Sequence, residues 1–208
     1  SIMLASEICP RIAAFLLWYG WACLFNRNIL ISNPGLPYVG WILLAFCFVE
    51  KEKPAILDQI QNPILRYLKK DRLPRRLFWS AWILMSLGYT ASGLHKLVVS
   101  PSWRDGTALQ FVLEGSLARD NWIRNLLIQY PTFLRLNTYL SLFLEISFLP
   151  LGTFYYTRLP YWVIYMAFHL GILLTINFAD LTLGVMMVHL LTFDHLWIEW
   201  FSSISLPN

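Results

Sequence analysis

The chain has 208 residues, of which 57% are hydrophobic and only 13% are charged, and its formal net charge is +4. Soluble domains usually carry about a quarter of charged residues, so this composition argues against a soluble enzyme and against a nucleic-acid-binding domain. It predicts an all-α membrane protein. We attribute the excess of Lys and Arg over Asp and Glu to membrane topology and expect no nucleic-acid partner.

Long apolar runs predict a polytopic transmembrane helix bundle of about five or six spans, because crossing about 30 Å of hydrocarbon takes roughly 20 helical residues. In chain order, the expected spans are 2–25, 35–49, 77–98, 132–156, 161–178 and 181–200. The second is short and has Pro34 and Pro37 at its start, which fits a half-span or a start within the preceding loop. We expect one domain over 1–208.

Two loops between these spans determine the expected orientation. Residues 50–76 are rich in Lys and Arg, which places this loop in the cytoplasm and residues 99–131 on the extracytoplasmic side. Apolar residues at helical spacing in 54–70 predict interfacial helices, and a plain anchor for anionic lipids is the alternative. The many apolar residues of 101–131, among them Trp103, predict helical structure that folds back onto the bundle as a lid.

Three titratable residues fall at the middle of expected spans: Glu145, His169 and His189. A titratable group at the centre of a bilayer is costly unless it is paired, so each is a candidate for function. We expect Glu145 and His169 to contact each other, with His189 as a third member. The pair can tie helices together, or it can exchange a proton or bind a polar headgroup, and the sequence leaves both roles open.

Lys96 lies nearer the extracytoplasmic end of the third expected span, at a depth similar to that of His95, Asn177 and Asp180. We expect its ammonium to bond to Asp180 or Asn177 while Trp103 and the lid shield it from water. A lysine desolvated by apolar walls loses proton affinity and can act as a base, so Lys96 and His95 are the candidate catalytic residues. The alternative is an interfacial lysine that extends its ammonium into the headgroups.

The sequence carries no metal-site or nucleotide-binding signature. Cys9, Cys23 and Cys47 lie in apolar segments without CxxC spacing or a nearby His, so neither a disulfide framework nor a zinc site is expected. No GxSxG, Walker A, GxGxxG or HExxH motif occurs. Haem ligation by His169 and His189 from two helices stays open as an alternative.

Four segments, in order along the chain, carry a resemblance to a known family. They are Leu17-Trp-Tyr through Phe25-Asn-Arg27-Asn with Ile31-Ser-Asn33; Tyr89-Thr-Ala-Ser-Gly-Leu-His-Lys96-Leu followed by Trp103-Arg-Asp-Gly106-Thr-Ala; Leu144-Glu145 with Pro150; and Phe168-His169-Leu-Gly171 through Thr175-Ile-Asn177. Together they extend over about 11–194 and resemble the HTTM family, the membrane domain related to vitamin K-dependent gamma-carboxylase.

The resemblance implies roles for three of the candidate residues. Lys96 occupies the position of the lysine proposed as the base of the carboxylase, which would deprotonate reduced vitamin K, and Glu145 and His169 fall on family motif positions. We expect part of the family's N-terminal helices to be missing from this sequence. We also expect the large lumenal domain, with which the carboxylase binds propeptide, not to be present in full in this sequence, so carboxylation of a protein substrate is not expected.

Two functions are therefore expected as alternatives. The first is a membrane protein of the carboxylase superfamily whose outer-leaflet pocket at Lys96 holds a quinone-like or lipid cosubstrate under the lid. The second is a non-catalytic accessory subunit of a larger membrane protein complex, or a factor in peptide maturation or export. Whether the chain is an enzyme stays open. Membrane lipids and other membrane protein subunits are the expected partners, and the cofactor is left unknown, with a quinone as a candidate and no metal signature.

Overall fold

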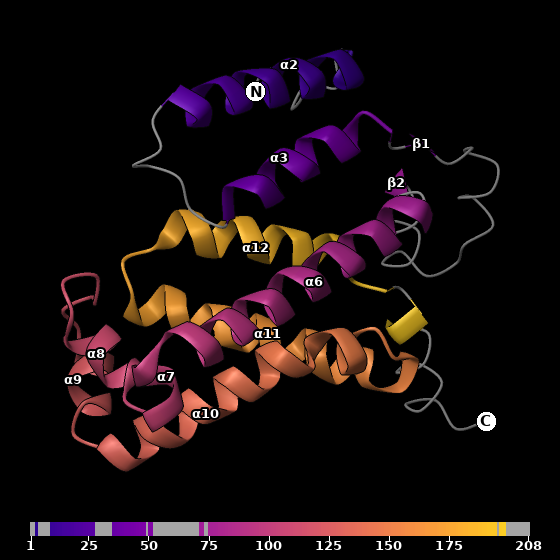
Figure 1. Cartoon of the computed structure of the whole chain (residues 1–208). Coiled ribbons are helices and arrows are strands. Elements are labelled where there is room, and N and C mark those ends of the chain that lie inside the picture. The colour runs from indigo at the N-terminus through magenta and orange to yellow at the C-terminus, as the bar shows by residue number, and fades with distance from the viewer. Residues whose placement is uncertain are drawn as a thin grey trace. The chain divides into compact units, whose positions relative to one another are not determined.

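The structure, a computed structural model, describes residue 3 and residues 9–27, 35–48, 50–51, 71–72, 75–194 and 196–198, with the backbone alone at 50–51, 71–72 and 180. Its ordered elements are almost all helical (Figure 1). They are α2 (Pro10–Arg27), α3 (Gly35–Phe46), α6 (Arg75–Val99), α7 (Pro101–Asp105), α8 (Ala108–Glu114), α9 (Trp122–Leu127), α10 (Pro131–Ser147), the π-helical turn η2 (Phe148–Gly152), α11 (Tyr155–Thr175) and α12 (Ala179–Leu191).

Two short strands border the basic loop between α3 and α6. Strands β1 (Glu50–Lys51) and β2 (Asp71–Arg72) pair antiparallel, with Glu50 opposite Arg72 and Lys51 opposite Asp71. No strand was expected from the sequence at this place. The interfacial helices expected within 54–70 lie outside the described residues.

The chain is helical, but the expectation of a polytopic transmembrane bundle is wrong. Within the described residues, no helix has both the length and the apolar character that crossing a bilayer requires. A span takes roughly 20 apolar helical residues, whereas α3 has 12, α12 has 13 and α10 has 17. The longer helices contain basic side chains, among them Arg75, Arg76 and Lys96 in α6 and Arg158 in α11.

The apolar runs are also divided differently from what their length suggests. The run 132–156 is shared between α10, which ends at Ser147, the turn η2 and the first residues of α11. The run 181–200 contains the end of α12 at Leu191. The expected multi-pass localisation, with 50–76 cytoplasmic and 99–131 extracytoplasmic, depends on continuous spans. Because those spans are absent from the described residues, this expectation is wrong too.

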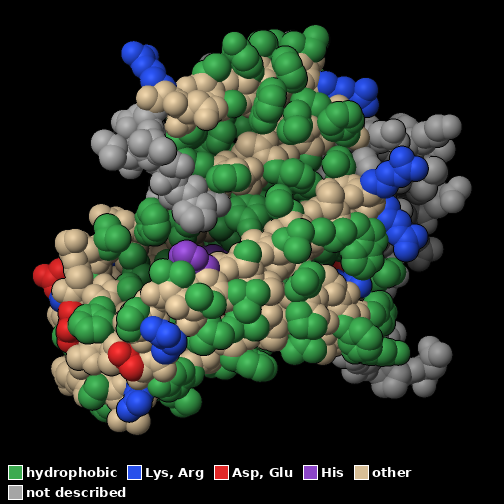
Figure 2. Space-filling model, in the orientation of Figure 1, with side chains coloured by type: hydrophobic (Ala, Val, Ile, Leu, Met, Phe, Trp, Pro, Cys, Tyr) green, Lys and Arg blue, Asp and Glu red, His purple; other side chains and the backbone are tan. Residues whose placement is uncertain are grey.

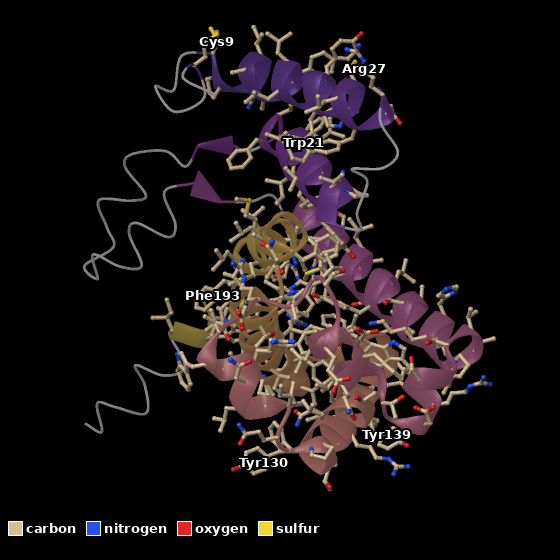
Figure 3. The ribbon with its side chains drawn as sticks, turned by 90° about the vertical axis from the view of Figure 1, so that its left-hand side faces the viewer. Cys9, Trp21, Arg27, Tyr130, Tyr139 and Phe193 are labelled. Atoms are coloured by element: carbon tan, nitrogen blue, oxygen red, sulfur yellow. The ribbon has the colours of Figure 1, made fainter. Side chains whose placement is uncertain are left out.

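The chain packs as two compact units, residues 1–80 with 187–208 (unit 1) and residues 81–186 (unit 2). In unit 1, α2 and α3 pack together through small buried residues, Ala13 and Ala14 on α2 and Ala45 on α3. Trp21, labelled in Figure 3, reaches from α2 toward α3 and donates its indole N–H to the carbonyl of Leu36 at 3.2 Å. The expected single domain over 1–208 stays a prediction.

Unit 2 has an aromatic core formed by α6, η2 and α11. Trp82, Phe148 and Tyr165 are fully or almost fully buried, and their rings contact one another through Phe148. Burying aromatic side chains of this size contributes roughly 1.5–3 kcal/mol each. The turn η2 follows where Pro150 interrupts regular helical bonding, and Thr90 of α6 accepts a hydrogen bond there from the amide of Leu149 at 3.1 Å.

The segment 101–131, which was expected to fold back, contains α7, α8 and α9, and all three pack against α10. Gly106 ends α7 in the left-handed conformation, with φ of 83°. A side chain at this position would lie 2.6 Å from Cγ of Arg135, so both the backbone and the close packing require glycine.

Many large apolar side chains remain on the surface. On α10 they share one helix face, at a spacing of three or four residues: Phe133, Leu136, Leu140 and Phe143. Figure 2 shows such hydrophobic side chains over much of the visible face of each unit. The hydrophobic composition therefore reflects exposed helix faces as well as a core.

Candidate functional site: polar pairs on one face of α6

One face of α6 carries the residues that assemble the site. Tyr89, Gly93 and Lys96 follow one another at spacings of four and three residues, which places them on one side of the helix. Gly93 is buried, and a Cβ there would lie 2.9 Å from both Cβ of Glu145 and the backbone nitrogen of Ile146. This close approach of α6 and α10 places Glu145 beside the polar residues of α6.

Lys96 and Glu145 form an ion pair. The Nζ of Lys96 donates to Oε1 of Glu145 at 2.5 Å, and the side chains are 27% and 6% exposed. Charge-assisted hydrogen bonds of this kind are stronger than those between neutral groups. Within the part of the chain that the structure describes, the second carboxylate oxygen, Oε2, is buried and has no hydrogen-bond partner.

Trp103 of α7 covers the lysine. The Nζ of Lys96 lies 4.4 Å from the centre of the indole ring, within the range of a cation–π interaction. The contact joins the 101–131 segment to the ion pair, and the expected shielding of Lys96 from water stays a prediction.

His169 of α11 pairs with Tyr89. The phenol Oη lies 2.6 Å from Nε2 of the imidazole, and His169 is only 3% exposed. Burial lowers the pKa of His169 from 6.5 to about 4, so the ring is neutral near pH 7. Burial also raises the pKa of the neighbouring Tyr165 phenol, and the charge of Glu145 raises it further.

The expected partners of these residues are only partly correct. Glu145 and His169 are both buried, as expected, but Glu145 pairs with Lys96 and His169 with Tyr89. Lys96 was expected to bond to Asp180 or Asn177. The side chain of Asp180 lies outside the described residues, and Asn177 is exposed, with its backbone N–H donating to the carbonyl of Leu117.

The pairing differs from the expectation because of the register of α6 against α10. Assigning depths in a bilayer placed Glu145 at mid-span and Lys96 well away from it, whereas the contact at Gly93 brings the two side chains together. Tyr89 as the partner of His169, and the close approach at Gly93, were missed by sequence reasoning. The spacing of Tyr89, Gly93 and Lys96 was the available signal for a shared face.

The structure also places the other two histidines considered from the sequence. His95 is exposed on α6, and neighbouring helical positions point in different directions. His189 belongs to unit 1, where it is fully buried. Among the described residues no group of three or more His, Cys, Asp or Glu side chains is placed to hold a metal ion.

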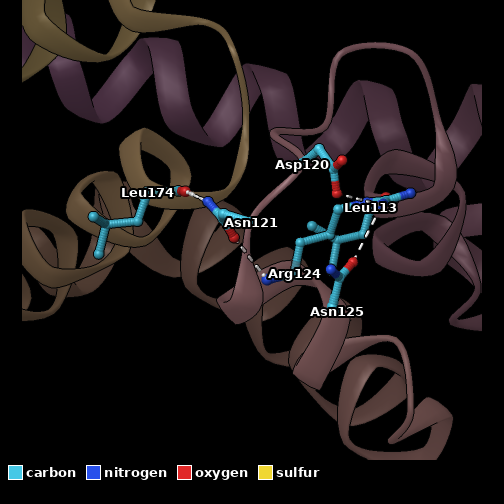
Figure 4. Close-up of polar contacts among 6 residues, drawn as sticks. All are labelled: Leu113, Asp120, Asn121, Arg124, Asn125 and Leu174. Atoms are coloured by element: carbon cyan, nitrogen blue, oxygen red, sulfur yellow. Dashed lines mark hydrogen bonds and ion pairs between the residues drawn. The ribbon is translucent and has the colours of Figure 1, made fainter.

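The connection between α8 and α9 is fastened to the end of α11 (Figure 4). Asn121 caps α9 by accepting a hydrogen bond from the amide of Arg124 at 2.9 Å, and its side-chain amide donates to the carbonyl of Leu174 at 2.7 Å. Nearby, the amide of Arg119 donates to the carbonyl of Thr175 at 2.8 Å. These bonds hold the connection between α8 and α9 against the end of α11.

Comparison with known proteins finds no matching family model, no matching curated protein and no matching solved structure. The resemblance to the HTTM family therefore stays a prediction that depends on the four sequence segments.

Proposed function

We propose that the Lys96–Glu145 pair binds and deprotonates an apolar cosubstrate with a weakly acidic hydroxyl, as a hydroquinone has. The observation that carries the proposal is the buried Oε2 of Glu145, which has no hydrogen-bond partner among the described residues. Leaving a buried acceptor unsatisfied costs about 1–3 kcal/mol. A ligand hydroxyl that donates to Oε2 would recover this free energy.

The ion pair assigns different roles to its two members. Lys96 is an ammonium donor in the pair, so the free oxygen of Glu145 is the atom that can accept a proton. As the ligand hydroxyl gives its proton to Oε2, the ammonium of Lys96 stabilises the negative charge that develops on the ligand oxygen. This differs from the resemblance, which implies that Lys96 itself is the base.

The residues around the pair fit an aromatic ligand. Trp103 offers a flat ring beside the ammonium for contact with an aromatic ligand. A quinone or hydroquinone would be held by hydrogen bonding to Glu145 and by contact with Trp103, and it would supply the acidic hydroxyl. His95 has no part in the proposal because its side chain is exposed away from the pair.

A binding titration tests the proposal. The full chain is mixed anaerobically with a reduced naphthoquinone, and absorbance is followed for the hydroquinone anion. We expect the bound anion at a pH below that at which the free hydroquinone ionises, because Glu145 takes the proton and Lys96 stabilises the anion. Glu145→Gln should abolish the anion signal.

Glu114→Gln is the matched control, since Glu114 is an exposed carboxylate of the same unit, bonded to Gln110. It should leave the signal unchanged. A wild-type chain that binds no hydroquinone, or binds it without forming the anion, contradicts the proposal.

A second candidate function is a non-catalytic subunit of a larger assembly. The exposed apolar face of α10, formed by Phe133, Leu136, Leu140 and Phe143, favours it because faces of this kind often mark protein interfaces. On this alternative the ion pair only joins helices, and neither wild type nor Glu145→Gln binds the hydroquinone. No contact in the described residues favours a role in peptide maturation or export.

A further inference from the structure

The Tyr89–His169 pair is a second polar pair on the same face of α6, and the proposed proton transfer does not use it. Its oxygen and nitrogen are 2.6 Å apart, and Tyr89 is half-buried whereas His169 is buried. With the ring proton on Nδ1, Nε2 of the neutral imidazole accepts the phenol hydrogen. In this tautomer the pair is a phenol bonded to a base.

This arrangement suits the removal of one electron from the phenol. A phenol that loses an electron becomes a strong acid, so its oxidation is easiest where a base takes the proton in the same step. The imidazole of His169 is placed to do so across an existing hydrogen bond, without a movement of either side chain.

The surroundings of Tyr89 fit a radical that persists. Its ring stacks on Phe148, with centres 4.8 Å apart, and lies 4.3 Å from the ring of Tyr165. Phe148 and Tyr165 are almost completely buried, so these neighbours form an apolar wall that excludes water from one side of the phenol. The partial exposure of Tyr89 leaves another side open to an oxidant.

We propose that Tyr89 and His169 form a one-electron redox site that reduces organic radicals of the peroxyl class. One electron passes from the phenol of Tyr89 to the peroxyl radical, and the phenol proton passes to Nε2 of His169. The products are a neutral tyrosyl radical, an imidazolium and a hydroperoxide anion, which takes up a proton from solvent. The site consumes one radical per chain and needs neither Lys96 nor Glu145.

Electron paramagnetic resonance tests the proposal. The full chain is exposed in aerated buffer to peroxyl radicals from a thermal azo initiator and is then frozen. We expect a neutral tyrosyl radical with the lowered principal g value that a hydrogen bond from an imidazolium produces at high field. Tyr89→Phe should abolish this signal, and His169→Gln should remove the lowered g value.

Tyr156→Phe is the control, since Tyr156 is an exposed tyrosine of the same unit whose ring contacts are with Phe154 and Tyr155. It should leave the signal intact. Persistence of the same signal in Tyr89→Phe, or its loss in Tyr156→Phe, overturns the proposal. If circular dichroism shows that Tyr89→Phe does not fold, the radical of the wild type is measured in deuterated buffer instead. A radical without an exchangeable hydrogen-bonded proton also overturns the proposal.

Discussion

The two pairs on α6 have similar geometry and opposite electrostatics. Lys96 with Glu145 and Tyr89 with His169 each join α6 to a neighbouring helix by a short hydrogen bond. The first pair keeps two charges, because each charge is the partner of the other and Trp103 covers the ammonium. The second is neutral near pH 7, because the burial of His169 lowers its pKa to about 4.

The comparison shows that the chemistry of each pair depends on what surrounds it more than on the residue types. A histidine with a carboxylate partner would tend to stay protonated, and a lysine buried without one would tend to lose its proton. The exchange of expected partners therefore changes the chemistry of both sites: one is an ion pair and the other is a phenol–imidazole pair.

The largest effect is expected from removing one charge of the ion pair. Lys96→Met leaves the carboxylate of Glu145 buried without its partner, which costs about 3–5 kcal/mol for a fully buried pair. The loss should be smaller here because Lys96 is 27% exposed. Chemical denaturation of Lys96→Met, Glu145→Gln and the double variant measures it.

The double variant is the informative member of this cycle. It should be more stable than the sum of the single changes predicts, because no charge is left unpaired. Additive losses would mean that the two side chains do not interact in solution, and the charged half of the comparison would be incorrect.

The neutral pair should make stability depend on pH. The pKa of His169 is 6.5 when unfolded and about 4 when folded, so below pH 6.5 the unfolded state binds more protons. Stability is full above pH 6.5 and falls by up to about 3 kcal/mol as the pH decreases to about 4. His169→Gln should remove this part of the pH dependence, measured as denaturation midpoints across the range. An unchanged slope would mean that His169 is not held neutral by burial.

The next effect concerns the glycine that separates the two pairs. Gly93→Ala places a Cβ 2.9 Å from the backbone of Ile146, which cannot move away as a flexible side chain would. We expect a loss of about 1–3 kcal/mol from overpacking, measured by thermal unfolding. Alanine has a more favourable helix propensity than glycine, so a loss of stability would occur in spite of that propensity.

Gly171→Ala provides the matched control. Gly171 lies within α11 of the same unit, and nothing lies within 4 Å of its added Cβ. This variant should be neutral or gain about 0.5–1 kcal/mol. Equal effects of the two substitutions would show that α6 and α10 do not approach closely at Gly93.

Sequence reasoning could locate helices and candidate residues but not their partners. The expected helix at 77–98 agrees with α6 at Arg75–Val99, and Glu145 and His169 are buried as expected. Apolar run length did not reveal where α10 ends, because Ser147 and the turn around Pro150 lie inside one apolar run. Partner choice depends on the helix register at Gly93, which no local sequence pattern specifies.

The smallest effect is expected at the connection between α8 and α9, which lies in the same 101–131 segment as Trp103. Asn121→Ala removes the N-cap of α9 and the side-chain bond to Leu174, which should cost about 0.5–2 kcal/mol. The control is Asn125→Ala on the exposed side of α9, where the contact with Arg124 is long, at 3.4 Å, and little loss is expected.

The same two variants sharpen the comparison between the pairs. Lys96 depends on α7 for its cover, whereas the Tyr89 ring is packed by Phe148 and Tyr165, which lie outside the 101–131 segment. Loosening that segment by Asn121→Ala should therefore increase hydrogen exchange at α7–α9 and weaken hydroquinone binding, while the peroxyl-derived radical on Tyr89 is unaffected. If both activities fall together, the two pairs do not act as independent sites.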